Sequence, residues 1–140
     1  MKIGVESDYL KKEFEADFHL SNKDSFTRIR RPDWDDIKEL LLKVKGKEGT
    51  VRLTVLPDPD VGPAKLDVST ENGFYLLTLL EYSESDSDVR SYWDMSKIDN
   101  KIMILGNYWP ERQLTKDFDL VVRIFKEFFD TGNVSTDLLN

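Results

Sequence analysis

Residues 115–132 constrain the fold most, because their apolar side chains recur at the spacing of one face of an α-helix. The residues that make up this face are Phe118, Val121, Val122, Phe125, Phe128 and Phe129. A face this rich in phenylalanine is too apolar to remain in water, so we expect it to pack on a sheet or on another helix. The alternative, a helix that fills a groove on a partner, is the rarer use of such a face.

The flanks of this stretch also predict a helix, over residues 116–130. Thr115 can cap the first turn, and Asp117 and Asp119 suit the positive end of the helix dipole. Gly132 suits the left-handed turn that commonly ends a helix.

A second helix is predicted over residues 33–45. Pro32 prevents an extension toward the N-terminus, Asp33 can cap the first turn, and Gly46 follows as a stop signal. Acidic residues occupy the early turns and lysines the last ones, as the helix dipole favours. The apolar stripe of this helix consists of Trp34, Ile37, Leu40, Leu41 and Val44.

Residues 50–106 predict a mostly antiparallel sheet of about five strands. Apolar and polar residues alternate over 51–55 and 66–68, and further strands are expected at 89–94 and 101–105. Asn72-Gly73 is a strong hairpin signal, because both residues tolerate positive φ. Residues 74–82 are apolar on both faces, which is typical of a central strand. With the two helices, these strands predict a single α+β domain spanning residues 1–140.

Residues 1–30 are the least informative part of the chain. Apolar and polar residues alternate from Phe14 to Leu20, which favours a half-buried strand. A short helix beginning at Tyr9 is the alternative for the residues just before this strand. Residues 106–112 are expected to form a loop that leads into the last helix.

The composition narrows the classes of function. Hydrophobic residues make up 39% of the chain, and no apolar run approaches the roughly 20 residues that span a bilayer. The chain has no cysteine, which excludes disulfides, thiol catalysis and thiolate metal sites. Glu6 and Asp8 interrupt any signal-peptide core, so we expect a cytoplasmic protein. The net charge of −7 disfavours nucleic acid and anionic membranes, and it favours either solubility alone or a cationic partner.

The basic residues Arg28, Arg30 and Arg31 form the one cluster of positive charge, beside Phe26 and Trp34. Arginines next to aromatic rings can stack on nucleic-acid bases. Three arginines are a thin footprint in an acidic protein, so we favour pairing with the chain's own carboxylates.

No motif for catalysis, a cofactor or a metal stands out. His19 is the only histidine, and no Ser-His-Asp set or His-Glu-x-x-His motif accompanies it. Asp58 and Asp60, like Asp117 and Asp119, have the spacing of paired metal or acid–base carboxylates. Turn formation explains the first pair, and the start of a helix explains the second. We therefore expect a protein that is not an enzyme, with a small metal-dependent hydrolase using these aspartates as the alternative.

Three stretches carry a family resemblance. They are Arg31-Pro32-Asp33-Trp34-Asp35-Asp36-Ile37, Asn72-Gly73-Phe74-Tyr75-Leu76-Leu77, and the stretch from Ile104-Leu105-Gly106-Asn107-Tyr108-Trp109 through Phe128-Phe129-Asp130-Thr131-Gly132-Asn133-Val134-Ser135. Together they resemble small bacterial immunity proteins encoded beside polymorphic toxins of the contact-dependent growth inhibition or Rhs type. The resemblance implies a protein that neutralises a cognate toxin domain, with a cationic nuclease as the expected toxin. It supplies no catalytic residue to transfer.

An acidic loop with aromatic neighbours is the expected contact with the toxin, since an acidic inhibitor gains steering toward a cationic target. The residues predicted to bind the partner are Glu84, Asp86, Asp88, Tyr92, Trp93, Tyr108 and Trp109. The three carboxylates lack the rest of a calcium loop. Two alternatives remain: residues 83–88 form only a solvated hairpin loop, or the chain is a ligand-binding or regulatory module with an apolar pocket beside Tyr108 and Trp109.

Overall fold

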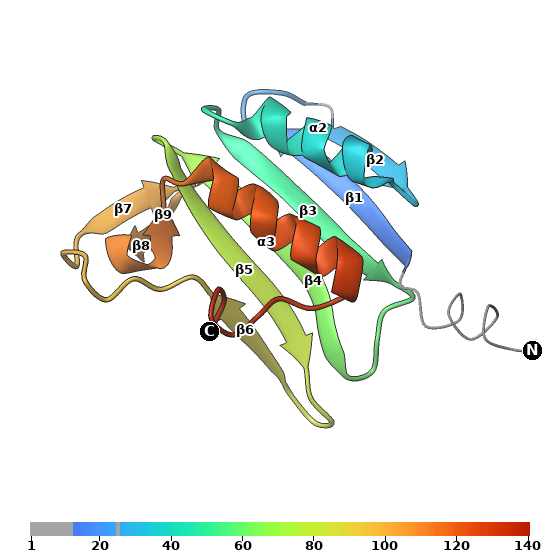
Figure 1. Cartoon of the computed structure of the whole chain (residues 1–140). Coiled ribbons are helices and arrows are strands. Elements are labelled where there is room, and N and C mark those ends of the chain that lie inside the picture. Colours follow the sequence, from blue (N-terminus) through green and yellow to red (C-terminus); the bar gives the residue numbers. More distant parts are fainter. Residues whose placement is uncertain (1–12, 25) are drawn as a thin grey trace, which may run out of the picture.

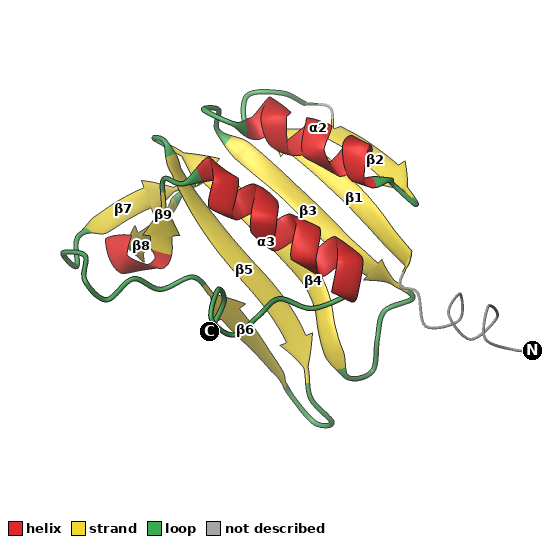
Figure 2. Cartoon of the chain, in the orientation of Figure 1, coloured by secondary structure: helices red, strands yellow, loops and turns green. Residues whose placement is uncertain are grey.

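In the residues that the structure describes, two helices cover one face of a mostly antiparallel sheet, so the architecture is α+β (Figure 1). The structure is a computed structural model that describes residues 13–24 and 26–140. Helix α2 spans Trp34–Val44 and α3 spans Phe118–Thr131, which confirms both predicted helices. Figure 2 shows them side by side in front of the strands. In the described part of the chain, no helix has the length and apolar character needed to cross a membrane.

Within residues 13–24 and 26–140, seven strands form the main sheet, in the order β2-β1-β3-β4-β5-β6, with β9 paired to β5 as well. Strands β7 and β8 form a separate hairpin, and the short 3-10 helix η1 (Glu111–Gln113) follows it. The bounds are β1 (Glu13–Leu20), β2 (Phe26–Arg30), β3 (Gly49–Leu56), β4 (Gly62–Glu71), β5 (Phe74–Tyr82), β6 (Ser87–Ser91), β7 (Lys101–Ile104), β8 (Asn107–Pro110) and β9 (Leu114–Thr115).

The prediction of about five strands starting near residue 50 was therefore wrong. The alternation over 14–20 does mark a strand, β1. This strand pairs with β3, which follows α2 in the sequence, and pairing between such distant segments leaves no local sequence signal. Strand β8 was expected to be a loop. It follows a tight turn at Leu105 and Gly106, with φ of 49° and 91°, and leucine is rarely found at positive φ. The signal-peptide argument and the helix considered at Tyr9 concern residues outside the described range.

The main core lies between the sheet and the apolar faces of both helices. Phe14 of β1 packs edge-on against Phe128 of α3, with ring centroids 5.4 Å apart, and it also contacts Phe129 at 5.6 Å. Val51 and Leu66, from the neighbouring strands β3 and β4, are fully buried in the same core. Trp34 packs at the edge of this core. Residues of both predicted helix faces and of the predicted strands are buried in it: Ile37, Leu41, Leu53, Leu77, Val121 and Phe125.

A second, smaller core explains why β5 is apolar on both faces. Near the start of β5, Leu76 and its pairing partner Leu114 of β9 lie on the face opposite the helices, where they are buried with Ile104 of the β7–β8 hairpin. Trp109 of β8 packs at the rim of this cluster. Strand β5 lies one place from the edge of the sheet. The expectation of a central strand was therefore wrong, because two covered faces do not require a central position.

Capping side chains fix the ends of both helices. Asp33 caps α2 by accepting from the Asp36 N–H at 2.8 Å, and the Asp36 carboxylate accepts in return from the Asp33 N–H at 3.0 Å. Asp117 caps α3, whereas Thr115, the predicted cap, lies in β9 and accepts from the Asp117 N–H. Gly132 ends α3 at φ 77°, as its sequence position predicted.

Candidate binding surface

The groups with catalytic spacing have structural roles in this fold. Asp117 caps α3, and the exposed Asp119 lies in the first turn of that helix. His19 is exposed, and its Nε2 lies 2.9 Å from the carbonyl oxygen of Lys23. Within residues 13–24 and 26–140, no group of three or more histidines and carboxylates is placed to hold a metal ion.

The two aspartate pairs also lie far apart. Asp58 and Asp60 are exposed in the loop before β4, whose first residue pairs with Tyr82 at the end of β5. Asp117 follows β9, which pairs with Tyr75 near the start of β5. These positions are seven residues apart along one strand, or about 23 Å. The fold therefore does not bring the four aspartates together.

The arginine cluster is paired with carboxylates of β1, as we had favoured. Arg28 Nε lies 2.7 Å from Asp17 Oδ1, and this bond with the charge of Asp17 raises the pKa of the guanidinium. Two weaker pairs follow along the strand, Arg30 with Glu15 at 3.3 Å and Arg31 with Glu13 at 3.6 Å. The positive charge of β2 is thus balanced locally.

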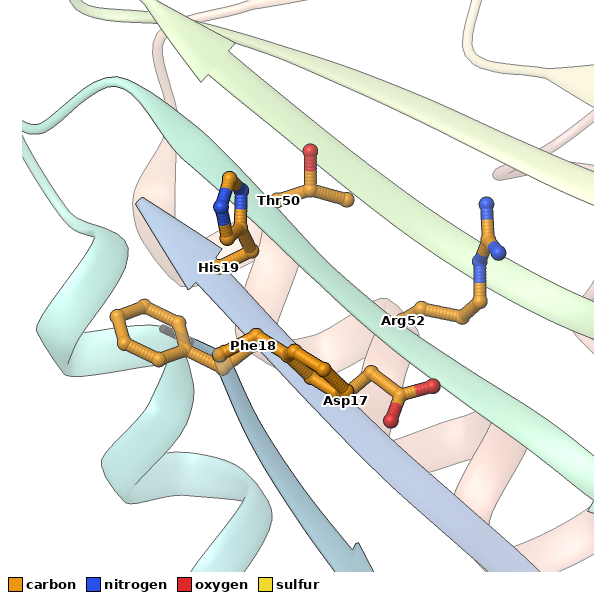
Figure 3. Close-up of a pocket in the computed structure, with 6 residues that line it drawn as sticks. Asp17, Phe18, His19, Thr50 and Arg52 are labelled. Carbon is orange, nitrogen blue, oxygen red and sulfur yellow. The ribbon is translucent and has the colours of Figure 1, made fainter. Parts of the chain in front are cut away.

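A shallow cavity of about 300 Å³ lies against strands β1, β2 and β3 (Figure 3), and neither Tyr108 nor Trp109 is among the residues that line it. It is lined by Asp17, Phe18, His19, Phe26, Thr50 and Arg52. Arg52 donates from Nε and Nη2 to the two oxygens of Asp67, each at 2.8 Å. Its charge is therefore engaged by a neighbouring strand, and the polar groups that face the cavity with fewer partners are His19 and Thr50.

The predicted acidic loop is an ordered hairpin between β5 and β6. Glu84, Asp86 and Asp88 are all exposed, and the Ser83 N–H donates to the Asp86 carbonyl oxygen at 2.8 Å across the turn. The hairpin extends beyond the body of the sheet (Figure 1). Its carboxylates are accessible to a partner.

The four predicted aromatic anchors divide into two kinds. Tyr92 packs against the main core, and burial raises the pKa of its phenol, with a smaller contribution from the charge of Asp94 and an opposing hydrogen bond from Thr115. Trp109 packs on the second core. Trp93 and Tyr108 instead point outward, and they are available for contact.

Two further exposed apolar side chains follow Trp93 in the sequence, and they were not among the predicted contact residues. Met95 is 67% exposed and Ile98 is 74% exposed, compared with 45% for Trp93 and 68% for Tyr108. We call these four residues the exposed apolar surface. They make up half of the eight large hydrophobic side chains that are exposed in the described residues. Met95 and Ile98 are isolated apolar residues in the polar stretch 94–100, and this pattern predicts only a loop.

Backbone hydrogen bonds fix the segment that carries this surface. The Asp94 N–H donates to the Arg112 carbonyl oxygen, and the Glu111 N–H donates to that of Asn100, each at 2.7 Å. Arg112 Nε donates to the carbonyl oxygen of Lys97 at 2.8 Å. The loop after β6 is therefore hydrogen-bonded to η1, and η1 directly follows β8. The segment that carries Trp93, Met95 and Ile98 is thus held against the segment that follows Tyr108.

A model described as a family of unknown function (DUF6911) matches residues 13–138. The chain belongs to this family. A comparison with curated proteins gave no match. A crystal structure of a hypothetical protein from Neisseria gonorrhoeae is similar to this DUF6911 chain, with a TM-score of 0.72, 20% identity, and coverage of 89% of this chain and 91% of the other. At that identity, the likeness shows the shared fold alone.

Proposed function

We propose that this protein is a non-catalytic immunity protein that binds and neutralises a cognate toxin domain, and that the toxin is a cationic nuclease. The observation that carries the proposal is the exposed apolar surface on a hydrogen-bonded segment. Tryptophan, tyrosine and methionine are enriched where interface energy concentrates. A rigid segment also loses little conformational entropy when a partner covers it.

The acidic hairpin supports the same function. Glu84, Asp86 and Asp88 project from the sheet into solvent, in a chain with a net charge of −7. Negative charge on an exposed projection accelerates encounter with a cationic surface. In this proposal, the hairpin guides the approach and the exposed apolar surface supplies most of the affinity.

The test uses the toxin domain that we expect the neighbouring reading frame to encode. Trp93→Ala and Tyr108→Ala should each weaken binding of that domain by about tenfold or more, measured by calorimetry or surface plasmon resonance. Leu42→Ala is the matched control, because Leu42 is also an exposed large hydrophobic but lies on α2. Protection of cells from the toxin should follow the same order.

Two outcomes would contradict the proposal. The first is a neighbouring toxin domain that does not bind, or that binds both variants with wild-type affinity. The second is micromolar binding of Mg²⁺, Ca²⁺ or Mn²⁺ that Asp117→Ala abolishes, which would favour the metal-dependent hydrolase instead.

A further inference from the structure

The outer edge of β6, on the side away from β5, already pairs with one residue near the end of the described chain, Asn140. Strand β6 ends the order of the main sheet. The Ser91 N–H donates to the Asn140 carbonyl oxygen at 3.3 Å, and the Asn140 N–H donates to the Ser91 carbonyl oxygen at 2.9 Å. Two reciprocal bonds of this kind define a hydrogen-bonded antiparallel pair. The backbone of β6 therefore accepts strand pairing on the side that faces away from β5.

This pairing stops at Ser91, although the edge continues. Alternate residues of a strand direct their N–H groups to the same side, so those of Ser87 and Val89 share the edge of Ser91. The Ser87 N–H donates to Asp86 Oδ1 and the Val89 N–H donates to Asp88 Oδ1, each at 2.8 Å. The three outward N–H groups of β6 are thus bound by two carboxylate side chains and by Asn140, and none of them is bound by the backbone of another strand of the sheet.

Two of these three oxygens are easily replaced. Asp86 and Asp88 are exposed, and exchanging one acceptor for another in water changes the free energy little. A strand added along β6 would present carbonyl oxygens at the same places. The displaced carboxylates would then lie beside the added strand, free to pair with its basic side chains.

The side chains of β6 specify the sequence pattern of such a strand. Val89 is 55% exposed and pairs with Leu80 of β5, on the face of the sheet opposite the helices. Asp88 pairs with Glu81 and points to the other face. A matching strand therefore alternates apolar residues, which lie beside Val89, with basic residues, which lie beside the carboxylates.

We propose that the outer edge of β6 is a strand-addition site for an extended segment of the partner in which basic and apolar residues alternate. The inference rests on the proposed function, because that partner is the toxin domain. The opposite edge of the sheet, β2, carries arginines and should not accept a basic strand.

The probe is a capped nonapeptide of alternating lysine and valine, added to the full-length ¹⁵N-labelled chain. Saturating peptide should slow amide hydrogen exchange at Ser87 and Val89 by about tenfold or more, because strand hydrogen bonds replace side-chain ones. The matched control peptide is N-methylated at its valines, which removes backbone donors without changing its charge. It should give no such protection.

Two double variants distinguish binding at the edge of β6 from non-specific attraction of the basic peptide to negative charge. Asp86→Asn with Asp88→Asn keeps an oxygen acceptor at each position but removes both charges, and it should weaken peptide binding by about tenfold. Asp58→Asn with Asp60→Asn removes the same charge from the neighbouring loop, and it should leave the affinity within about twofold.

Three results would overturn the inference: equal protection by the N-methylated peptide, protection at Phe26–Arg30 instead of at β6, or dimerisation of the Asp86→Asn, Asp88→Asn variant in sedimentation. The last would assign the edge to a second copy of this chain. None of these results alters the effect expected of Trp93→Ala on toxin binding, so that variant tests the proposed function independently of the strand-addition site.

Discussion

At the scale of single residues, two tyrosines link burial to pH. Tyr75 faces the main core and is almost fully buried, and Tyr92 packs at its edge. For both phenols, burial is the largest cause of a raised pKa, because the phenolate loses hydration. A raised pKa in the folded state means that the unfolded chain releases these protons first as the pH increases.

The predicted consequence is a loss of stability in alkaline solution. The contribution of these tyrosines should be complete below about pH 10, the value for an unfolded chain, and should disappear as the pH rises through their higher folded values. The variant Tyr75→Phe, Tyr92→Phe should therefore lose less stability between about pH 9 and pH 11. Urea unfolding at each pH measures this, with phenolate absorbance in urea as the unfolded reference. Parallel curves for variant and wild type would contradict the assignment.

Single residues also show what a sequence cannot decide about a binding surface. Trp93 and Tyr108 are exposed while their neighbours Tyr92 and Trp109 pack on the two cores. The sequence alone identifies Tyr92-Trp93 and Tyr108-Trp109 as candidate contact residues. Which member of each faces outward depends on the direction of the chain as it leaves β6 and enters β8, and that direction is set by hydrogen bonds to distant residues.

At the scale of elements, α3 shows how far a strong local pattern reaches. Its apolar face, its capping region and its stop signal were all predicted from the sequence, because each depends on residues within one or two helical turns of one another. Ile124, which the sequence pattern omitted from the face, is fully buried as well. The face is wider than predicted because α3 contacts both the sheet and α2.

Replacing a residue of this face should destabilise the fold strongly. Phe125 is fully buried, so Phe125→Ala should reduce the free energy of unfolding by about 3–5 kcal/mol, through lost transfer energy and a cavity. The control is Phe26→Ala, since Phe26 on edge strand β2 is largely exposed, and it should cost below about 1 kcal/mol. Denaturant unfolding measures both. Equal costs would show that α3 is not the core helix described here.

Strands were predicted less well than helices, for a physical reason. A strand is stabilised by a neighbour that can lie anywhere in the chain, as β1 is by β3 across α2. Strand β2 is short and polar, and its partner β1 supplies the carboxylates that balance its arginines. Only the β4–β5 pair, joined at Asn72-Gly73, had a local turn signal that specified the pairing.

At the scale of the whole molecule, the topology gathers negative charge at one end. The start of β1 pairs with the end of β3, and the start of β4 pairs with the end of β5. The loops after β2, β3 and β5 therefore meet at the same end of the sheet. The exposed carboxylates in these loops are Asp33, Asp58, Asp60, Glu84 and Asp86, with Asp35 at the start of α2 and Asp88 at the start of β6 beside them. The exposed Arg31 also lies in the first of these loops. The loops at the opposite end contain lysines as well as carboxylates, so the charge of the molecule is asymmetric.

This asymmetry should orient the encounter with a cationic toxin domain. Glu84→Gln, Asp86→Asn and Asp88→Asn together should slow association by about tenfold at low salt, because the steering charge is lost. The difference from wild type should shrink as added salt screens the remaining charge. Stability should hardly change, since exposed carboxylates contribute little to it. Stopped-flow or surface plasmon resonance measurements over a range of salt concentrations give these rates.

The matched control removes the same charge from the opposite end, with Asp24→Asn, Glu48→Gln and Asp119→Asn, all at exposed positions. Net charge is then identical in the two variants, and only its location differs. If the acidic end steers the toxin, the control should associate at close to the wild-type rate. Equal slowing in both variants would mean that net charge alone sets the rate, and a wild-type rate in both would mean that the encounter does not depend on the hairpin.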